Sequence, residues 1–214
     1  LNALTDWLTG NNPIRLFNVV AIGGMGKSAL TWKWFNDIAP KEQPGLAGRV
    51  WWSFYESDAH YENFIIRTLA YVSAQTEHAV RQLAPPEREQ QLLHQLDSQP
   101  FLLVLDGLER ILLAYARMDA AYLADDDLDQ RTANLIADAH GLPQDVKETY
   151  LEKHRLRRCA DPRAGRFLQQ LARVHKSRIL ISTRLYPAEL QSLTAQPLPG
   201  CSALFLRGLN DDDA

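Results

Sequence analysis

One short glycine-rich segment, residues 21–28, constrains the fold of this chain more than any other part of its sequence. Its residues are Ala-Ile-Gly-Gly-Met-Gly-Lys-Ser, and they lie between an apolar run over residues 16–22 and a run over residues 27–38 with helical spacing. A strand, a glycine loop and a helix N-terminus in this order point several backbone N–H groups at one place. We therefore expect this segment to bind phosphate groups.

Each residue type in the segment has a task in phosphate binding. Glycines let the backbone approach phosphate oxygens without interference from a Cβ, Lys27 brings a positive charge, and Ser28 offers a hydroxyl ligand to Mg²⁺. Ala21 departs from the usual pattern, which has its first glycine there. The alternative is a glycine-rich turn with an incidental Lys-Ser pair. The expected cofactor-binding residues are Gly23, Gly24, Met25, Gly26, Lys27, Ser28 and Ala29.

Three further candidates follow the ends of other predicted strands. Asp106 follows five apolar residues and is expected to hold Mg²⁺ together with Ser28; its alternative role is to cap the helix after Gly107. Glu109 is the candidate base for an attacking water, or else a solvated acid at a helix start. Arg184 is expected to grip the γ-phosphate and distinguish ATP from ADP, or else to be a surface arginine.

Strands and helices alternate along the chain, which indicates an α/β fold with a parallel sheet wrapped by helices. The predicted strands cover residues 16–22, 49–55, 101–105, 178–182 and 203–206. Residues 1–214 are expected to form one domain with a helical insert at residues 114–160, between the third and fourth strands. The insert contains an acidic run at residues 125–127 and a basic cluster at residues 153–158, both interpreted as solvated helix faces.

Composition narrows the class of protein. A net charge of −3 gives no electrostatic footprint for nucleic acid, and no apolar run approaches the roughly 20 residues that cross a bilayer. Cys159 and Cys201 lack the spacing of metal ligands and are interpreted as buried thiols in a reducing compartment. We expect a cytoplasmic protein, cut at both ends from a larger chain, that binds neither membrane nor nucleic acid directly.

Four stretches resemble the signal-transduction ATPases of the STAND class, and most closely their NB-ARC group. The stretches are residues 22–28 (the Walker A loop), 50–54, 102–106 (the Walker B strand) and 177–184, and residues 206–210 resemble the fifth strand and its exit. The NB-ARC group usually has two adjacent acids after the third strand. Here Gly107 and Leu108 separate Asp106 from Glu109, an arrangement more similar to the NACHT ATPases.

The resemblance implies a P-loop NTPase sheet of order 5-1-4-3-2 in a bacterial regulatory or defence protein. It implies binding of ATP or ADP with Mg²⁺, slow hydrolysis, and a switch from a closed ADP form to an ATP-bound homo-oligomer. Sensor and effector domains of the same protein, and the elements that contact adenine, are implied to lie outside residues 1–214. Two alternatives remain: a mechanical or metabolic P-loop ATPase or kinase, and a nucleotide-free scaffold using Trp51, Trp52 and the insert as an interface.

Overall fold

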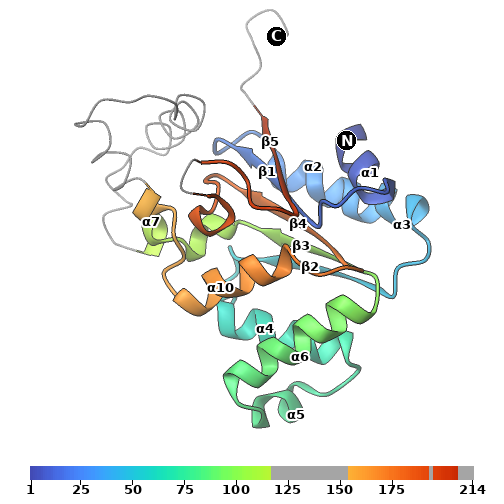
Figure 1. Ribbon diagram of the computed structural model, residues 1–214, viewed down its shortest axis with the longest axis vertical. Helices are drawn as coiled ribbons and strands as arrows, with labels where there is room; N and C mark the ends of the chain where they lie inside the picture. Colours follow the sequence, from blue (N-terminus) through green and yellow to red (C-terminus); the bar gives the residue numbers. More distant parts are fainter. Residues whose placement is uncertain (117–153, 193–194, 207–214) are drawn as a thin grey trace, which may run out of the picture.

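The computed structural model describes residues 1–116, 154–192 and 195–206, and these fold around a five-stranded parallel sheet flanked by helices (Figure 1). The neighbours in the sheet are β2-β3-β4-β1-β5. Counted from the β5 edge, the same arrangement is 5-1-4-3-2. The strands are β1 (Leu16–Ala21), β2 (Gly48–Ser53), β3 (Phe101–Asp106), β4 (Arg178–Thr183) and β5 (Cys201–Leu206).

The strands lie within two residues of their predicted bounds. The largest differences are at two strands: β2 ends at Ser53 rather than at residue 55, and β5 begins at Cys201 rather than at residue 203 because Cys201 and Ser202 already pair with β1. Residues 207–210, which resemble the exit from the fifth strand, lie outside the described part of the chain.

Two hydrophobic cores cover the two faces of the sheet, because successive side chains of a strand point to opposite faces. Leu103 and Leu105 of β3 face the larger core, which packs against α4, α6 and α10. Leu102 and Val104 face the smaller core, beneath α1 and the helical segment that follows α2. Figure 1 shows these two groups of helices on opposite sides of the sheet.

The helices mostly follow the predicted pattern, with two corrections. Residues 27–38 are predicted to form one helix, but α2 ends at Lys33. A π-helical turn (Trp34–Ile38) follows it directly and leads into α3. Pro40 lacks an N–H and cannot donate to the carbonyl four residues earlier, which disfavours a continuous α-helix. The helix α5 was not predicted. The bounds are α1 (Asn2–Thr9), α2 (Lys27–Lys33), α3 (Ala39–Glu42), α4 (Tyr61–Val72), α5 (Glu77–Gln82), α6 (Pro85–Ser98), α7 (Leu113–Ala116) and α10 (Pro162–Leu171).

Most of the expected insert, residues 117–153, lies outside the described residues, and so does the acidic run at residues 125–127. Its two flanks meet: the Leu113 N–H donates to Arg158, and the Ala160 N–H donates to Ile111. The interpretation of the basic cluster as solvated is wrong for Arg157. This residue is buried, and its guanidinium donates to the Gln191 side chain at 2.8 Å. The hydrogen bond reduces the cost of burying a charged group.

The paired tryptophans of β2 occupy opposite faces of the sheet. Trp52 is buried in the larger core, whereas Trp51 packs edge-to-face against the half-exposed Trp32 of α2, with ring centroids 4.8 Å apart. Both cysteines are buried free thiols, as expected. Among the helices in the described ranges, none has the length and apolar content needed to span a bilayer.

Candidate functional site

The glycine-rich loop leaves β1 at the carboxyl edge of the sheet and leads directly into α2. Gly24 and Gly26 adopt positive φ angles of 80° and 71°, which side chains other than glycine rarely adopt. Gly26 is the N-cap of α2, and its carbonyl accepts the first helical hydrogen bond from Leu30. The loop thus turns sharply and leads into a helix N-terminus, whose first N–H groups have no acceptor within the helix itself.

Lys27 folds back across the loop. Its ammonium Nζ donates to the carbonyl oxygens of Ala21, at 2.5 Å, and Ile22, at 3.0 Å, and only 7% of the residue is exposed. The acceptors are the last residue of β1 and the residue that precedes Gly23. The positive charge therefore lies against the loop that is predicted to bind phosphate.

Asp106 lies beside the loop, at the end of β3. The Ser28 hydroxyl donates to Asp106 Oδ1 at 2.8 Å, which joins residues 78 positions apart in the sequence. The backbone is fixed on both sides, because the Asp106 carbonyl accepts from the Phe54 N–H and the Gly107 N–H donates to Ser182. The two residues expected to share Mg²⁺ are therefore in direct contact.

The electrostatics of Asp106 favour a cation nearby. The residue is 3% exposed, and this burial raises the pKa of its carboxyl above the usual value of 3.8, while the hydrogen bond from Ser28 acts in the opposite direction. A desolvated carboxylate gains more from a neighbouring positive charge than an exposed one does. Its oxygens and the Ser28 hydroxyl are the hard ligands that Mg²⁺ takes in proteins.

Arg184 follows β4 and lies against the glycine loop. Its guanidinium carbon is 3.0 Å from the position that a Cβ on Gly23 would occupy. Glycine at position 23 therefore makes room for the guanidinium. Arg184 Nε also lies 3.4 Å from Glu109 Oε1, so the arginine is between the loop and the candidate base.

Glu109 lies in the 3₁₀ turn Leu108–Ile111 rather than in an α-helix, and its exposed fraction is 0%. It is not the solvated helix-start acid of the alternative interpretation. Its carboxylate accepts hydrogen bonds from the backbone N–H of Arg184 at 3.1 Å and from the Tyr55 hydroxyl.

Tyr55 is a residue of this site that the sequence analysis missed. It comes two residues after β2, whose last residue, Ser53, pairs with Asp106. Its position just after a predicted strand could have identified it, because neighbouring parallel strands bring the residues that follow them to one edge of the sheet. Burial and the neighbouring Glu109 charge raise the pKa of the Tyr55 hydroxyl well above its usual range, which keeps it protonated and able to donate.

The structure therefore brings most of the candidate residues to one edge of the sheet. Lys27, Ser28 and Asp106 form one contiguous group, and Glu109 and Arg184 form a second group that reaches the loop at Gly23. Gly24 and Ala29 are exposed and Met25 is partly exposed. Across residues 1–116, 154–192 and 195–206, no group of three His, Cys, Asp or Glu side chains is arranged to hold a metal ion. A Mg²⁺ ion bound to Ser28 and Asp106 thus needs further oxygens from phosphate and water.

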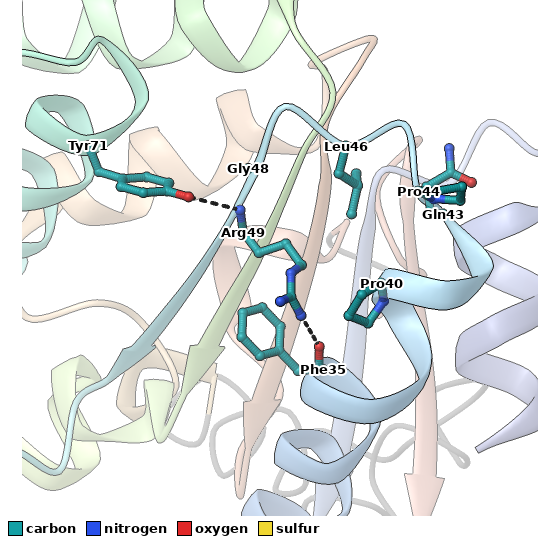
Figure 2. Close-up of a pocket in the computed structure, with 8 residues that line it drawn as sticks. All are labelled: Phe35, Pro40, Gln43, Pro44, Leu46, Gly48, Arg49 and Tyr71. Atoms are coloured by element: carbon teal, nitrogen blue, oxygen red, sulfur yellow. Dashed lines mark hydrogen bonds between the residues drawn. The ribbon is translucent and has the colours of Figure 1, made fainter.

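A pocket of about 260 Å³ lies at the other end of β2 and is separate from this site. Figure 2 shows the Arg49 guanidinium reaching the carbonyl of Phe35, and the Tyr71 hydroxyl accepting from the Arg49 N–H. The pocket is lined by Phe35, Pro40, Gln43, Pro44, Leu46, Gly48, Arg49 and Tyr71. It is at the amino end of the strand, whereas the loop and acids are at the carboxyl ends.

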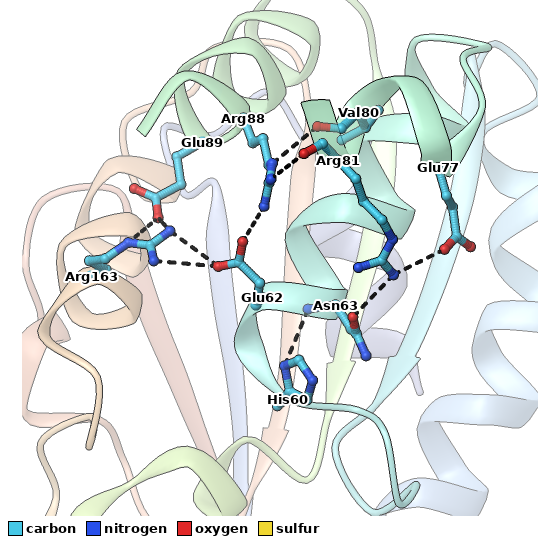
Figure 3. A network of polar contacts seen from close by, with 9 residues as sticks. All are labelled: His60, Glu62, Asn63, Glu77, Val80, Arg81, Arg88, Glu89 and Arg163. Atoms are coloured by element: carbon cyan, nitrogen blue, oxygen red, sulfur yellow. Dashed lines mark hydrogen bonds and ion pairs between the residues drawn. The ribbon is translucent and has the colours of Figure 1, made fainter. Parts of the chain in front are cut away.

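A charged network on the far side of the large core is also separate from the site. Figure 3 shows Glu62 of α4 between Arg88 of α6 and Arg163 of α10, with Glu89 of α6 on the other side of Arg163. Arg163 binds Glu89 at 2.6 Å. The alternating charges link three helices. They are ordinary ion pairs between side chains, so we interpret this network as structural and not as a nucleotide site.

In the comparisons with known proteins, no family model matched this sequence, and no curated protein matched it significantly.

Proposed function

We propose that this chain binds ATP or ADP with Mg²⁺ through its glycine-rich loop and serves as the nucleotide-binding module of a STAND-class, NB-ARC-like switch. The observation that carries the proposal is the 2.8 Å hydrogen bond between Ser28 and Asp106. It joins the hydroxyl after the loop lysine to the acid at the end of a neighbouring strand. A P-loop NTPase requires this pair to hold Mg²⁺ at the β- and γ-phosphates.

Each residue has a distinct role in the proposed site. The amides of residues 23–28 cradle the phosphates, and Lys27 exchanges its two carbonyl acceptors for phosphate oxygens. Mg²⁺ held by Ser28 and Asp106 supplies positive charge to the β- and γ-phosphates when bound. Arg184, adjacent to Gly23, binds the γ-phosphate and so distinguishes ATP from ADP.

Hydrolysis in this site needs a water positioned behind the γ-phosphate. Glu109 accepts a proton from that water, the water oxygen bonds to phosphorus, and the bond to the β-phosphate oxygen breaks to give ADP and phosphate. Glu109 is fully enclosed in this conformation, so we expect slow turnover. Slow turnover suits a switch, in which nucleotide occupancy rather than product is the output.

The wider partners are part of the same proposal. A switch of this kind acts on sensor and effector domains of its own protein and changes the assembly of identical copies. Fast multiple-turnover hydrolysis, or phosphate transfer to a small molecule, would instead support the mechanical or metabolic alternative.

Titration calorimetry with ATP and Mg²⁺ tests the proposal. Lys27→Ala removes the loop cation and should weaken ATP binding about ten- to a hundredfold, the effect of losing charge-assisted hydrogen bonds. Lys33→Ala is the matched control, because Lys33 is an exposed lysine in the last turn of the same helix. Equal ATP affinity in the two variants would end the claim that the loop binds phosphate.

A further inference from the structure

Tyr55 and Glu109 meet at the end of the sheet in a way that the proposed function does not require. The Tyr55 hydroxyl donates to Glu109 Oε1, which also forms an ion pair with the Arg184 guanidinium. The other carboxylate oxygen, Oε2, accepts from the backbone N–H of Arg184. The whole residue is 0% exposed and its side chain 1% exposed, so Glu109 has almost no contact with solvent. In this conformation the carboxylate is enclosed by its protein partners and is not open to an attacking water.

Tyr55 covers this carboxylate from the solvent side. The residue is 46% exposed, whereas Glu109 beneath it is enclosed. The Tyr55 ring lies against Gly107, where a Cβ would come within 2.5 Å of a ring carbon. Gly107 has a φ of 72° and lies between Asp106 and the turn that carries Glu109. Glycine at this position therefore makes space for the ring as well as for the turn.

We propose that Tyr55 is a positioning residue that holds Glu109 in an enclosed orientation, from which the carboxylate must be released before it can contact the attacking water. The inference rests on the proposed function, because it assigns Glu109 the role of base. Arg184 couples nucleotide binding to the release of Glu109. A γ-phosphate beside Gly23 competes with the Glu109 carboxylate for the Arg184 guanidinium. The tyrosine hydroxyl is then the remaining side-chain donor to Glu109 among the contacts described above.

Tyr55→Phe removes the hydroxyl and keeps the ring over Gly107. We expect kcat for ATP hydrolysis to rise about tenfold, the population change that corresponds to losing one hydrogen bond to a charged group. ADP affinity should stay at the wild-type value, since the hydroxyl does not contact the loop that binds the phosphates. A rise in rate is a useful readout because misfolding or general loosening lowers activity.

Three further variants complete the test. Tyr71→Phe is the matched control: its hydroxyl accepts from the Arg49 N–H at the amino end of β2, far along the strand from Glu109, so its kcat should equal that of wild type. Glu109→Gln in the Tyr55→Phe background should abolish the gain, because the gain depends on the carboxylate. Tyr55→Leu, which removes both ring and hydroxyl, should raise kcat as Tyr55→Phe does.

The outcomes separate the inference from the proposal on which it rests. A wild-type protein that binds ATP, with a Tyr55→Phe variant whose kcat is unchanged or lower while ADP affinity is retained, overturns the role of Tyr55 alone. A gain in rate that survives Glu109→Gln overturns it as well. Failure of the wild-type protein to bind ATP overturns both.

Discussion

Asp106→Asn should make the protein more stable while removing its response to Mg²⁺. The substitution keeps the shape of the side chain. Its amide oxygen can still accept from the Ser28 hydroxyl, which lies 2.8 Å from Oδ1 in the wild-type protein. It removes a negative charge from a residue that is almost fully buried. We expect a gain of about 1 kcal/mol near neutral pH, because the cost of burying the charge exceeds what Ser28, Ser182 and Lys27 return to the carboxylate. For a domain of this size that corresponds to a rise in Tm of about 2–4 °C.

The pH dependence of this gain has a definite sign. Burial raises the pKa of Asp106 in the folded protein, so below the usual value of 3.8 the carboxyl is neutral in both states and the variant has no advantage. As pH rises towards the raised pKa, the unfolded chain loses its proton first, and wild-type stability falls relative to the variant. Above the raised pKa the difference is constant.

Thermal unfolding with and without ATP and Mg²⁺ measures both effects. A ligand that binds only the folded state raises Tm, so the wild-type protein should show a Mg²⁺-dependent increase that Asp106→Asn lacks. Asp97→Asn is a suitable control. Asp97 is an exposed acid that pairs with His175, and both residues lie at the opposite end of the sheet from Asp106. An Asp106→Asn variant that is less stable than wild type, or that keeps the full Mg²⁺ effect, would refute this reasoning.

Two other substitutions test the geometry around the sheet. Gly23→Ala places a Cβ 3.0 Å from the Arg184 guanidinium, which must move; we expect a stability change under about 1 kcal/mol but a reduced preference for ATP over ADP, measured by competition between the two nucleotides. Arg178→Met leaves the Gly10 and Ile14 carbonyls without the guanidinium that donates to them and that lies over the Trp7 ring, so urea unfolding should show a loss of about 2 kcal/mol. Unchanged urea stability would show that Arg178 does not anchor α1.

The arrangement of strands follows from patterns that lie within short segments. Residues 101–105 are five apolar residues in succession, and such a run has few alternatives to a strand covered on both faces. Gly24 and Gly26 turn the chain between β1 and α2 for a local reason, their freedom at positive φ. Strand ends that carry Asp106 and Arg184 then reach one edge because parallel strands share a direction.

The features that were missed depend on contacts between distant segments. The change of helix geometry at Trp34 accompanies packing of its ring in the smaller core and a hydrogen bond to Thr5, which no local pattern specifies. The short helix α5 had a local signal, since Thr76 accepts from the Ala79 N–H as an N-cap, but its few apolar residues gave no periodicity.

Enclosure of Glu109 is likewise a tertiary property. Tyr55 and Glu109 are 54 positions apart in the sequence, and their contact depends on the register of β2 and β3 and on the space above Gly107. The sequence pattern identifies Glu109 as a candidate residue but does not predict whether its side chain is buried or exposed. The burial of Arg157 has the same origin, because its acceptors Tyr186 and Gln191 come from the segment after β4.

The most direct measurement is a crystal structure of the protein with Mg²⁺ and a non-hydrolysable ATP analogue. We expect the β- and γ-phosphates to lie on the amides of residues 23–28, with the metal ion held by Ser28 and Asp106 and with Lys27 turned from the Ala21 carbonyl to the phosphates. A nucleotide bound elsewhere, or a metal ion that contacts neither side chain, would contradict this expectation.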